Sequence, residues 1–108
     1  MDVPEIDIAE TARRREAGTY ILDVREPEEY RDGHVPGVPL VPLGDLVERA
    51  DEVPTDQEVL VICRSGGRSA RAAEYLRGLG VDAVNIAGGT DGWIEAGHRV
   101  VTGDEPGA

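Results

Sequence analysis

The sequence contains no phenylalanine and no lysine, and it has one tryptophan and one cysteine. Without phenylalanine, its core must be built from valine, isoleucine, leucine and alanine. A single cysteine excludes an internal disulfide framework and is typical of a reducing compartment. No apolar run approaches the ~20 residues that a membrane helix needs, and the amino terminus lacks the basic start and apolar run of a signal peptide. We therefore expect a cytoplasmic protein that does not associate with membranes.

Positive charge is scarce, because 22 acidic residues face 11 arginines and the formal net charge is −11. This balance argues against nucleic acids and anionic membranes as partners. The triplet Arg13-Arg14-Arg15 stands beside Glu10 and Glu16, so a solvated helix face is the favoured interpretation of it. Charges beyond a Debye length of ~8 Å are largely screened, so arginines in direct contact with a small anion can outweigh the acidic background.

The length of 108 residues predicts one domain over residues 1–108. We expect its core to span about residues 5–101. Residues 102–108 are polar and contain proline and glycine, which predicts a frayed tail. The sequence does not indicate an oligomeric state.

Strand and helix patterns alternate along the chain, which predicts an α/β fold with a mainly parallel sheet covered on both faces. Strands are expected at residues 20–24, 59–62 and 83–86, with an edge strand or irregular segment at 38–41, where Pro39 and Pro42 cannot donate ladder hydrogen bonds. Helices are expected at about 8–17, from Pro27 to Gly33, around 43–50, from Ser69 to about Gly78, and at 90–96.

The most informative stretch is the apolar run Val59–Ile62, which ends at Cys63. Such a run is typical of a strand buried on both faces of a sheet. A glycine-containing loop and a helix start follow it, so Cys63 is predicted at the carboxyl end of a strand, under the amino end of a helix. Ligands and chemistry gather at this edge of open α/β sheets. We therefore interpret Cys63 as a nucleophile.

The loop after Cys63 has the composition of an anion-binding cradle. A free thiol has a pKa of ~8.5, and a helix amino end beside Arg64 and Arg68 favours its thiolate. Gly66 and Gly67 permit positive φ, so successive backbone N–H groups can converge on one point. A buried core cysteine is the alternative interpretation. The position between a buried strand and this loop favours the nucleophile.

Three motifs in this chain resemble signatures of the rhodanese family of sulfurtransferases. In this chain, residues 63–69 read Cys-Arg-Ser-Gly-Gly-Arg-Ser. This stretch resembles the active-site loop of that family. Residues 22–30 and 33–37 resemble the amino-terminal signature, and residues 88–93 resemble the carboxyl-terminal one. The motifs stand in the expected order and cover most of residues 20–97. The main departure is Val38-Pro39, where the family more often has a small residue and no proline.

The resemblance implies a single rhodanese domain with about five strands, and a reaction through a persulfide on Cys63. The thiolate would take sulfur from thiosulfate or a persulfide and pass it to cyanide or a thiol, with a protein among the candidate acceptors. The loop amides from Arg64 to Arg68 would stabilise the persulfide, and Arg64 and Arg68 would meet a sulfonate. The implied substrate-binding residues are Arg64, Ser65, Gly66, Gly67, Arg68 and Ser69. No cofactor and no metal are implied.

The remaining polar residues are given structural interpretations. Asp23 and Arg25 lie at a strand end, where we expect a buried or half-buried polar network. His34 precedes a Pro-Gly turn, and a catalytic role is disfavoured for it and for His98. Two histidines and one cysteine without ligand spacing make a zinc site improbable. Trp93 is predicted to be a core residue.

Two other classes of function compete with sulfur transfer. Phosphatases and arsenate reductases of the related loop type have five residues between the cysteine and the arginine, whereas four separate Cys63 from Arg68. A shorter ring leaves less room for a tetrahedral phosphate. Rhodanese-like domains also serve as non-catalytic binding or regulatory modules, particularly where the cysteine is lost. A persulfide carrier for a partner protein would use the same chemistry at Cys63.

Overall fold

Strands and helices alternate along the computed structural model, which describes residues 2–107. The strands are β1 (Glu5–Ile6), β2 (Tyr20–Asp23), β3 (Glu58–Ile62) and β4 (Asp82–Ile86). The α-helices are α1 (Ile8–Glu16), α2 (Pro27–Asp32), α3 (Leu46–Arg49), α4 (Gly67–Gly78) and α5 (Gly89–Glu95). Two short 3-10 helices, η1 (Leu43–Asp45) and η2 (Ala50–Glu52), flank α3.

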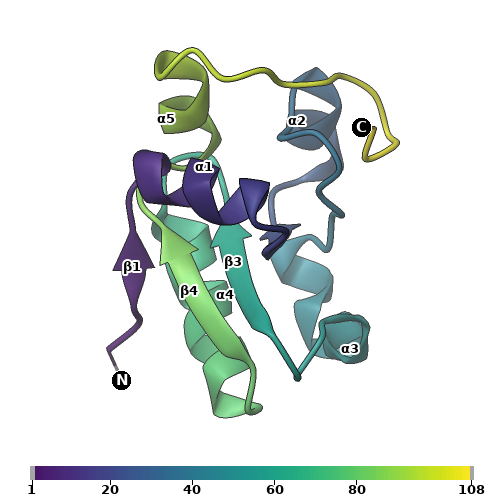
Figure 1. The fold of residues 1–108 in the computed structure, drawn as a ribbon. Helices are drawn as coiled ribbons and strands as arrows, with labels where there is room; N and C mark the ends of the chain where they lie inside the picture. Colours follow the sequence, from purple (N-terminus) through teal and green to yellow (C-terminus); the bar gives the residue numbers. More distant parts are fainter. Residues whose placement is uncertain (1, 108) are drawn as a thin grey trace.

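The strands form one parallel sheet in the order β1-β4-β3-β2 (Figure 1). Tyr20 of β2 pairs with Val59 of β3, and Val59 pairs with Ala83 of β4. Because the strands are parallel, their carboxyl ends meet at one edge of the sheet. This edge carries Cys63 directly after β3 and the start of α5 shortly after β4. The α/β class predicted from the alternation is therefore confirmed.

Alternate residues of β3 supply two separate cores, one on each face of the sheet. Val59 and Val61 belong to the core under α4, whereas Leu60 and Ile62 belong to the core with Trp93 of α5. All four of these β3 side chains are fully buried. In Figure 1, α4 lies behind the sheet and α1 in front of it. A strand covered on both faces needs apolar residues at every position, which is why this run has no polar interruption.

The helix starts follow local sequence signals. Asp7 caps α1, accepting the Glu10 N–H at 2.8 Å. Glu26 caps α2 in a reciprocal capping box with Glu29, and Pro27 occupies the first turn. Each cap satisfies N–H groups that have no partner within the helix.

The sheet has four strands, so the expectation of about five is corrected. Residues 38–41 form no strand, and only an isolated bridge joins Leu40 to Asp23 within the described chain. Pro39 and Pro42 remove the N–H groups that a longer ladder would need. β1, which we did not predict, is the edge strand beside β4. Two residues are too few to show an alternating pattern.

The carboxyl-terminal segment is hydrogen-bonded to the loop after α2. Val101 exchanges backbone hydrogen bonds with His34, and the Gly37 N–H donates to the Pro106 carbonyl at 2.8 Å. The Gly103 N–H donates to Arg31. The frayed tail expected at residues 102–108 stays a prediction, and Ala108 lies outside the described residues.

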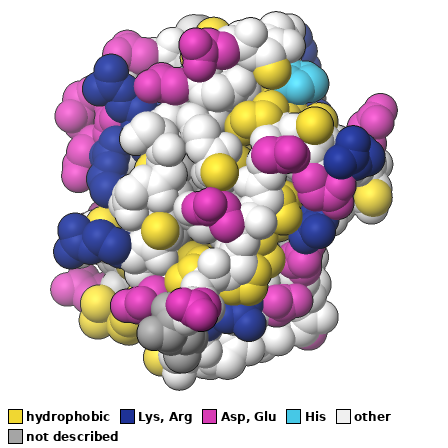
Figure 2. Space-filling view, turned by 90° about the vertical axis from the view of Figure 1, so that its left-hand side faces the viewer, with side chains coloured by type: hydrophobic (Ala, Val, Ile, Leu, Met, Phe, Trp, Pro, Cys, Tyr) yellow, Lys and Arg dark blue, Asp and Glu magenta, His cyan; other side chains and the backbone are white. Residues whose placement is uncertain are grey.

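Charged side chains are interspersed on the face that carries β1. Figure 2 shows acidic side chains between the arginines there, so the described residues form no broad basic patch on this face. Within the Arg13–Arg15 triplet, Arg13 and Arg14 pair with Glu10, and Arg15 donates to the Pro36 carbonyl. Within residues 2–107, no helix has the length and apolar character needed to cross a membrane.

Candidate active site

Cys63 follows β3 and lies 1% exposed at the entrance to α4. The helix begins at Gly67, earlier than the predicted Ser69, so the connecting loop is only Arg64–Gly66. Gly66 has φ of +118° and precedes the helix, a conformation that favours glycine. Gly67 is helical, so of the two glycines that permit positive φ only Gly66 adopts it. The tight turn directs the first amides of α4 toward the cysteine.

The Cys63 sulfur lies among hydrogen-bond donors at this helix start. The Gly66 N–H is 3.1 Å from Sγ, and the Ser69 hydroxyl oxygen is 3.2 Å from it. Burial raises the pKa of the thiol. The Ser69 hydroxyl and the N–H groups of Ser69, Gly66 and Ser65 lower it more, so the net pKa lies below its ordinary value. The site therefore favours a thiolate.

Asn85 of β4, which sequence reasoning missed, connects this sulfur to the sheet. Its Oδ1 is 2.5 Å from the Ser69 hydroxyl oxygen, and its Nδ2 donates to Glu5 and to the Gly66 carbonyl. Because the Ser69 hydroxyl has one hydrogen, it cannot donate to Asn85 and to a Cys63 thiolate at once. When Cys63 becomes a thiolate, the Ser69 hydroxyl therefore donates its hydrogen bond to sulfur instead of to Asn85. A lone polar residue in a buried apolar strand was the available sequence signal.

Ser69→Ala should make the thiol less reactive, because a thiolate loses one donor. A hydrogen bond to a charged group is worth about 1.5 kcal/mol or more, so we expect thiol alkylation at neutral pH to slow by about tenfold. The measurement is the rate of iodoacetamide alkylation across a pH series. Ser65→Ala is the matched control, because Ser65 acts on the sulfur through its backbone N–H. Equal rates in the two variants would contradict a role for the Ser69 hydroxyl.

The start of α5 is hydrogen-bonded to the cysteine loop, the segment that begins at Cys63 and ends at Gly66. The Thr90 N–H and hydroxyl donate to the Cys63 carbonyl at 2.8 and 3.1 Å, and the Asp91 N–H donates to the Arg64 carbonyl at 3.0 Å. Gly89 permits this approach, because a Cβ there would lie 2.5 Å from the Cys63 carbonyl oxygen. Neither Gly89 nor Thr90 was among the predicted site residues. The Gly-Gly-Thr motif was the signal that could have identified them.

Arg68 is paired with a carboxylate of α2. Its guanidinium makes two contacts with Glu29, at 2.6 and 2.8 Å. The Arg68 guanidinium lowers the pKa of Glu29 to about 2, so Glu29 is ionised at neutral pH. An anionic substrate would meet an Arg68 that already has a carboxylate partner. The predicted contact between Arg68 and substrate stays a prediction.

The Glu29–Arg68 pair should make stability depend on pH in the acid range. The pKa of Glu29 is about 2 in the folded protein against 4.5 ordinarily, so the pair's contribution is full above pH 4.5 and is lost as pH falls toward 2. After discounting for solvent screening, we expect about 1–2 kcal/mol. Urea unfolding of wild type and Glu29→Gln should differ by this amount at pH 7 and converge as pH falls to about 2. A constant difference would contradict the assignment.

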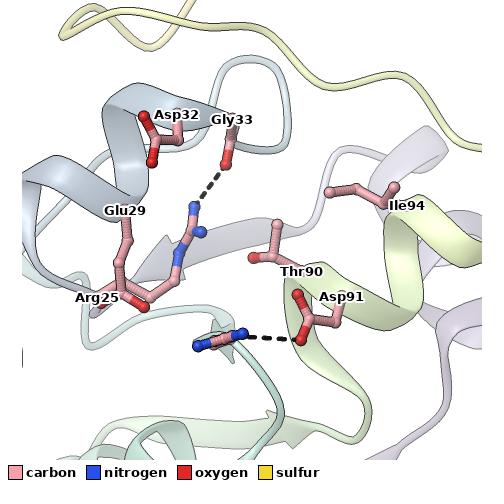
Figure 3. A pocket seen from close by; sticks show the side chains of 8 residues that line it. Arg25, Glu29, Asp32, Gly33, Thr90, Asp91 and Ile94 are labelled. Carbon is pink, nitrogen blue, oxygen red and sulfur yellow. Dashed lines mark hydrogen bonds and ion pairs between the residues drawn. The ribbon is translucent and has the colours of Figure 1, made fainter.

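A pocket of about 350 Å³ opens beside the loop (Figure 3). Its lining comes from α2 with the residues on either side of it, from the cysteine loop and from α5: Arg25, Glu29, Asp32, Gly33, Arg64, Thr90, Asp91 and Ile94. Arg64 is exposed and lies 3.4 Å from Asp91. Of the predicted residues at the site, Arg25 and Arg64 line this pocket. The others do not: Asp23, Cys63, Ser65, Gly66, Gly67, Arg68 and Ser69.

Comparisons with known proteins identify the family of this chain. The family model described as a rhodanese-like domain matches residues 7–96. The chain belongs to the rhodanese-like domain family. A solved structure of a rhodanese-related protein from Thermoplasma volcanium is similar, with a TM-score of 0.87 and 36% identity, covering 93% of this chain and 99% of that one.

Two curated relatives connect this rhodanese domain to sulfur chemistry. The chain is 37% identical to "Putative sulfurtransferase YtwF" of Bacillus subtilis (strain 168), over 86% of this chain and 92% of that protein. It is 36% identical to a protein named "Sulfurtransferase" of Allochromatium vinosum, over 92% of this chain and 95% of that protein. These similarities support a function of the sulfurtransferase type.

Asp23 and Arg25 form a buried ion pair next to the pocket of the rhodanese domain. Their closest contact is 2.9 Å, and both side chains are nearly inaccessible to solvent. Arg25 also donates to the Gly33 carbonyl at 2.8 Å, which ties the end of β2 to the end of α2. This is the buried polar network that we expected. It holds the pocket wall that α2 provides.

The two histidines of the rhodanese domain have structural contacts. His34 is buried, stacks on Tyr30 and has its ring nitrogens near the carbonyls of Tyr30, Glu105 and Pro106. His98 stacks on Trp93, which is buried in the core as predicted. Among the described contacts of Cys63 Sγ there is no histidine, and residues 2–107 contain no cluster of potential metal ligands.

Proposed function

We propose that this rhodanese domain transfers sulfane sulfur through a persulfide on Cys63. The Cys63 thiolate attacks the outer sulfur of the donor, a new S–S bond forms, and the donor's S–S bond breaks. Its electron pair leaves on sulfite, if the donor is thiosulfate, or on a thiolate, if the donor is a persulfide. Cyanide or a thiol then attacks the outer sulfur and releases the Cys63 thiolate. The acceptor comes from outside, because the chain has no second cysteine.

The observation that carries this proposal is the set of donors around Sγ. Amides of Ser65, Gly66 and Ser69 and the Ser69 hydroxyl lower the pKa of the thiol. The same groups can hold the negative charge of a bound persulfide. Since Cys63 is 1% exposed, loading also requires a movement of the loop that brings a donor to the sulfur.

The position of Arg68 favours sulfur over phosphate chemistry. Four residues separate Cys63 from Arg68, one fewer than in a phosphatase loop, and Arg68 is held by Glu29 through two contacts. The lowered pKa of Cys63 also disfavours a purely binding module, since binding alone gives no reason to activate a thiol. Sulfur transfer is therefore the better supported function.

Intact-mass spectrometry of the wild-type protein tests this function. After incubation with thiosulfate or cysteine persulfide, we expect a mass gain of one sulfur atom, which cyanide then removes as thiocyanate. Hydrolysis of an aryl phosphate should be negligible, because the four-residue spacing from Cys63 to Arg68 leaves less room for a tetrahedral phosphate. An unchanged mass with both donors would end the proposal, and phosphate hydrolysis would favour the phosphatase alternative.

A further inference from the structure

Each arginine at the pocket and the loop already has a carboxylate partner. Arg68 is held by Glu29 through two contacts and Arg64 by Asp91 at 3.4 Å. Arg25, the third, forms the buried pair with Asp23. The site therefore presents no cationic group, among those described, that is without a counter-charge.

The pocket carries a further acid beyond these pairs. Asp32 of α2 also lines it. Figure 3 shows Glu29 and Asp32 reaching the pocket from α2, and Asp91 from the start of α5. With Arg25, Arg64 and Arg68 each matched by an acid, Asp32 makes the surroundings negative. This is a poor environment for a small dianion.

We propose that Glu29 and Asp91 determine donor specificity by holding Arg68 and Arg64 away from small sulfur oxyanions, so that the site takes sulfur from an organic persulfide. This inference rests on the proposed sulfur transfer. It names two specificity-determining residues rather than groups that take part in bond making.

Displacement of a carboxylate is the physical basis of this discrimination. To contact Arg68, thiosulfate must break two charge-assisted contacts of 2.6 and 2.8 Å and leave Glu29 beside it as a like charge. The pKa of Glu29 is about 2, so protonation does not remove that charge near neutral pH. Thiosulfate binding is therefore opposed by both lost pairing and repulsion.

An organic persulfide meets the same carboxylates differently. Cysteine persulfide carries an ammonium group beside its carboxylate, whereas thiosulfate carries negative charge alone. Asp32 and Asp91 can pair with that ammonium group and so offset the repulsion of its negative charges. A pocket of about 350 Å³ is also in the range that holds an organic ligand rather than a small inorganic ion. Binding of the persulfide therefore leaves the pairs of Arg64 with Asp91 and of Arg68 with Glu29 intact.

The test compares two donors on variants that remove one charge each. Glu29→Gln keeps the side-chain acceptor for the Glu26 N–H, so the α2 capping box is retained. Asp91→Asn weakens the hold on Arg64. Glu28→Gln and Glu95→Gln are the matched controls, because each removes the same charge from an exposed position of the same helix.

We expect kcat/KM for thiosulfate to rise by about tenfold in Glu29→Gln, the equivalent of about 1.4 kcal/mol. The expected rise is about threefold in Asp91→Asn, whose pair is longer and solvent-exposed. For cysteine persulfide, kcat/KM should stay constant or fall. Both controls should match wild type with both donors.

Three results would overturn the inference. The first is an unchanged kcat/KM for thiosulfate in Glu29→Gln. The second is a parallel change with both donors, which would assign Glu29 only to loop support. The third is an equal rise in the Glu28→Gln control, which would indicate a general effect of net charge. If the wild-type protein accepts sulfur from neither donor, the proposed function itself is wrong, which is a different outcome from these three.

Discussion

Cys63→Ser should abolish both the mass gain from sulfur donors and the formation of thiocyanate. Serine is nearly the same size and keeps a hydrogen-bonding atom near Gly66 and Ser69. Its hydroxyl does not ionise near neutral pH, however, and cannot carry a sulfane sulfur. Loss of a covalent nucleophile removes the catalysed route, so turnover should fall by at least about a thousandfold. Intact-mass spectrometry and a thiocyanate assay measure the two effects.

The control for this substitution is a loop variant that keeps the thiol. Ser65→Ala preserves Cys63 and the amides around it, and it should still gain one sulfur atom. Urea unfolding of Cys63→Ser should show a folded protein, since the substituted atom has polar partners already in place. Residual sulfur loading of a folded Cys63→Ser would place the reaction elsewhere.

Gly89→Ala should have the largest effect on stability among single methyl additions. Gly89 has φ of +58°, and its Cβ would lie 2.5–2.6 Å from Cys63 and Arg64 backbone atoms, where no flexible side chain can move aside. The left-handed conformation costs ~1–2 kcal/mol and the overpacking ~1–3 kcal/mol, so we expect a loss of roughly 2–5 kcal/mol. Sulfur loading should fall too, because Thr90 would be displaced from the Cys63 carbonyl.

Gly78→Ala is the matched control for the methyl group. Gly78 ends α4 without positive φ, and nothing lies within 4 Å of a Cβ built there. Alanine should therefore stabilise the protein by about 0.5–1 kcal/mol. Urea unfolding of the two variants compares the same added methyl in two settings. Equal urea midpoints for Gly89→Ala and Gly78→Ala would contradict the close packing of α5 against the cysteine loop.

Much of the fold could be predicted because its signals are local. The run Val59–Ile62 indicates a doubly covered strand, and Asp7 and Pro27 mark helix starts. Each signal depends on neighbours within a few residues, whose spacing the sequence states directly. The same reasoning overestimated the sheet, because a short segment such as 38–41 has too little pattern to separate a strand from an extended loop. It missed β1 for the same reason.

Contacts across the sheet edge could not be predicted in this way. Arg68 and Glu29 are 39 positions apart, and Ser69 and Asn85 are 16 apart. No spacing rule relates such residues, since their proximity arises from the parallel order of β2, β3 and β4. The sequence interpretation therefore placed Arg68 in an open anion cradle, whereas the folded chain gives its guanidinium to a carboxylate.

The sequence by itself determined that one cysteine follows a buried strand, enters a glycine loop and stands at the start of a helix. Those features depend on consecutive residues, and they suffice to predict that this cysteine is a nucleophile. The tertiary structure decided which groups surround it. Packing α2 and α5 against the loop supplied Glu29, Thr90 and Asp91, because a parallel sheet brings the carboxyl ends of distant strands to one edge. The position of the sulfur can thus be predicted from neighbouring residues, whereas the charged groups around it depend on the tertiary structure.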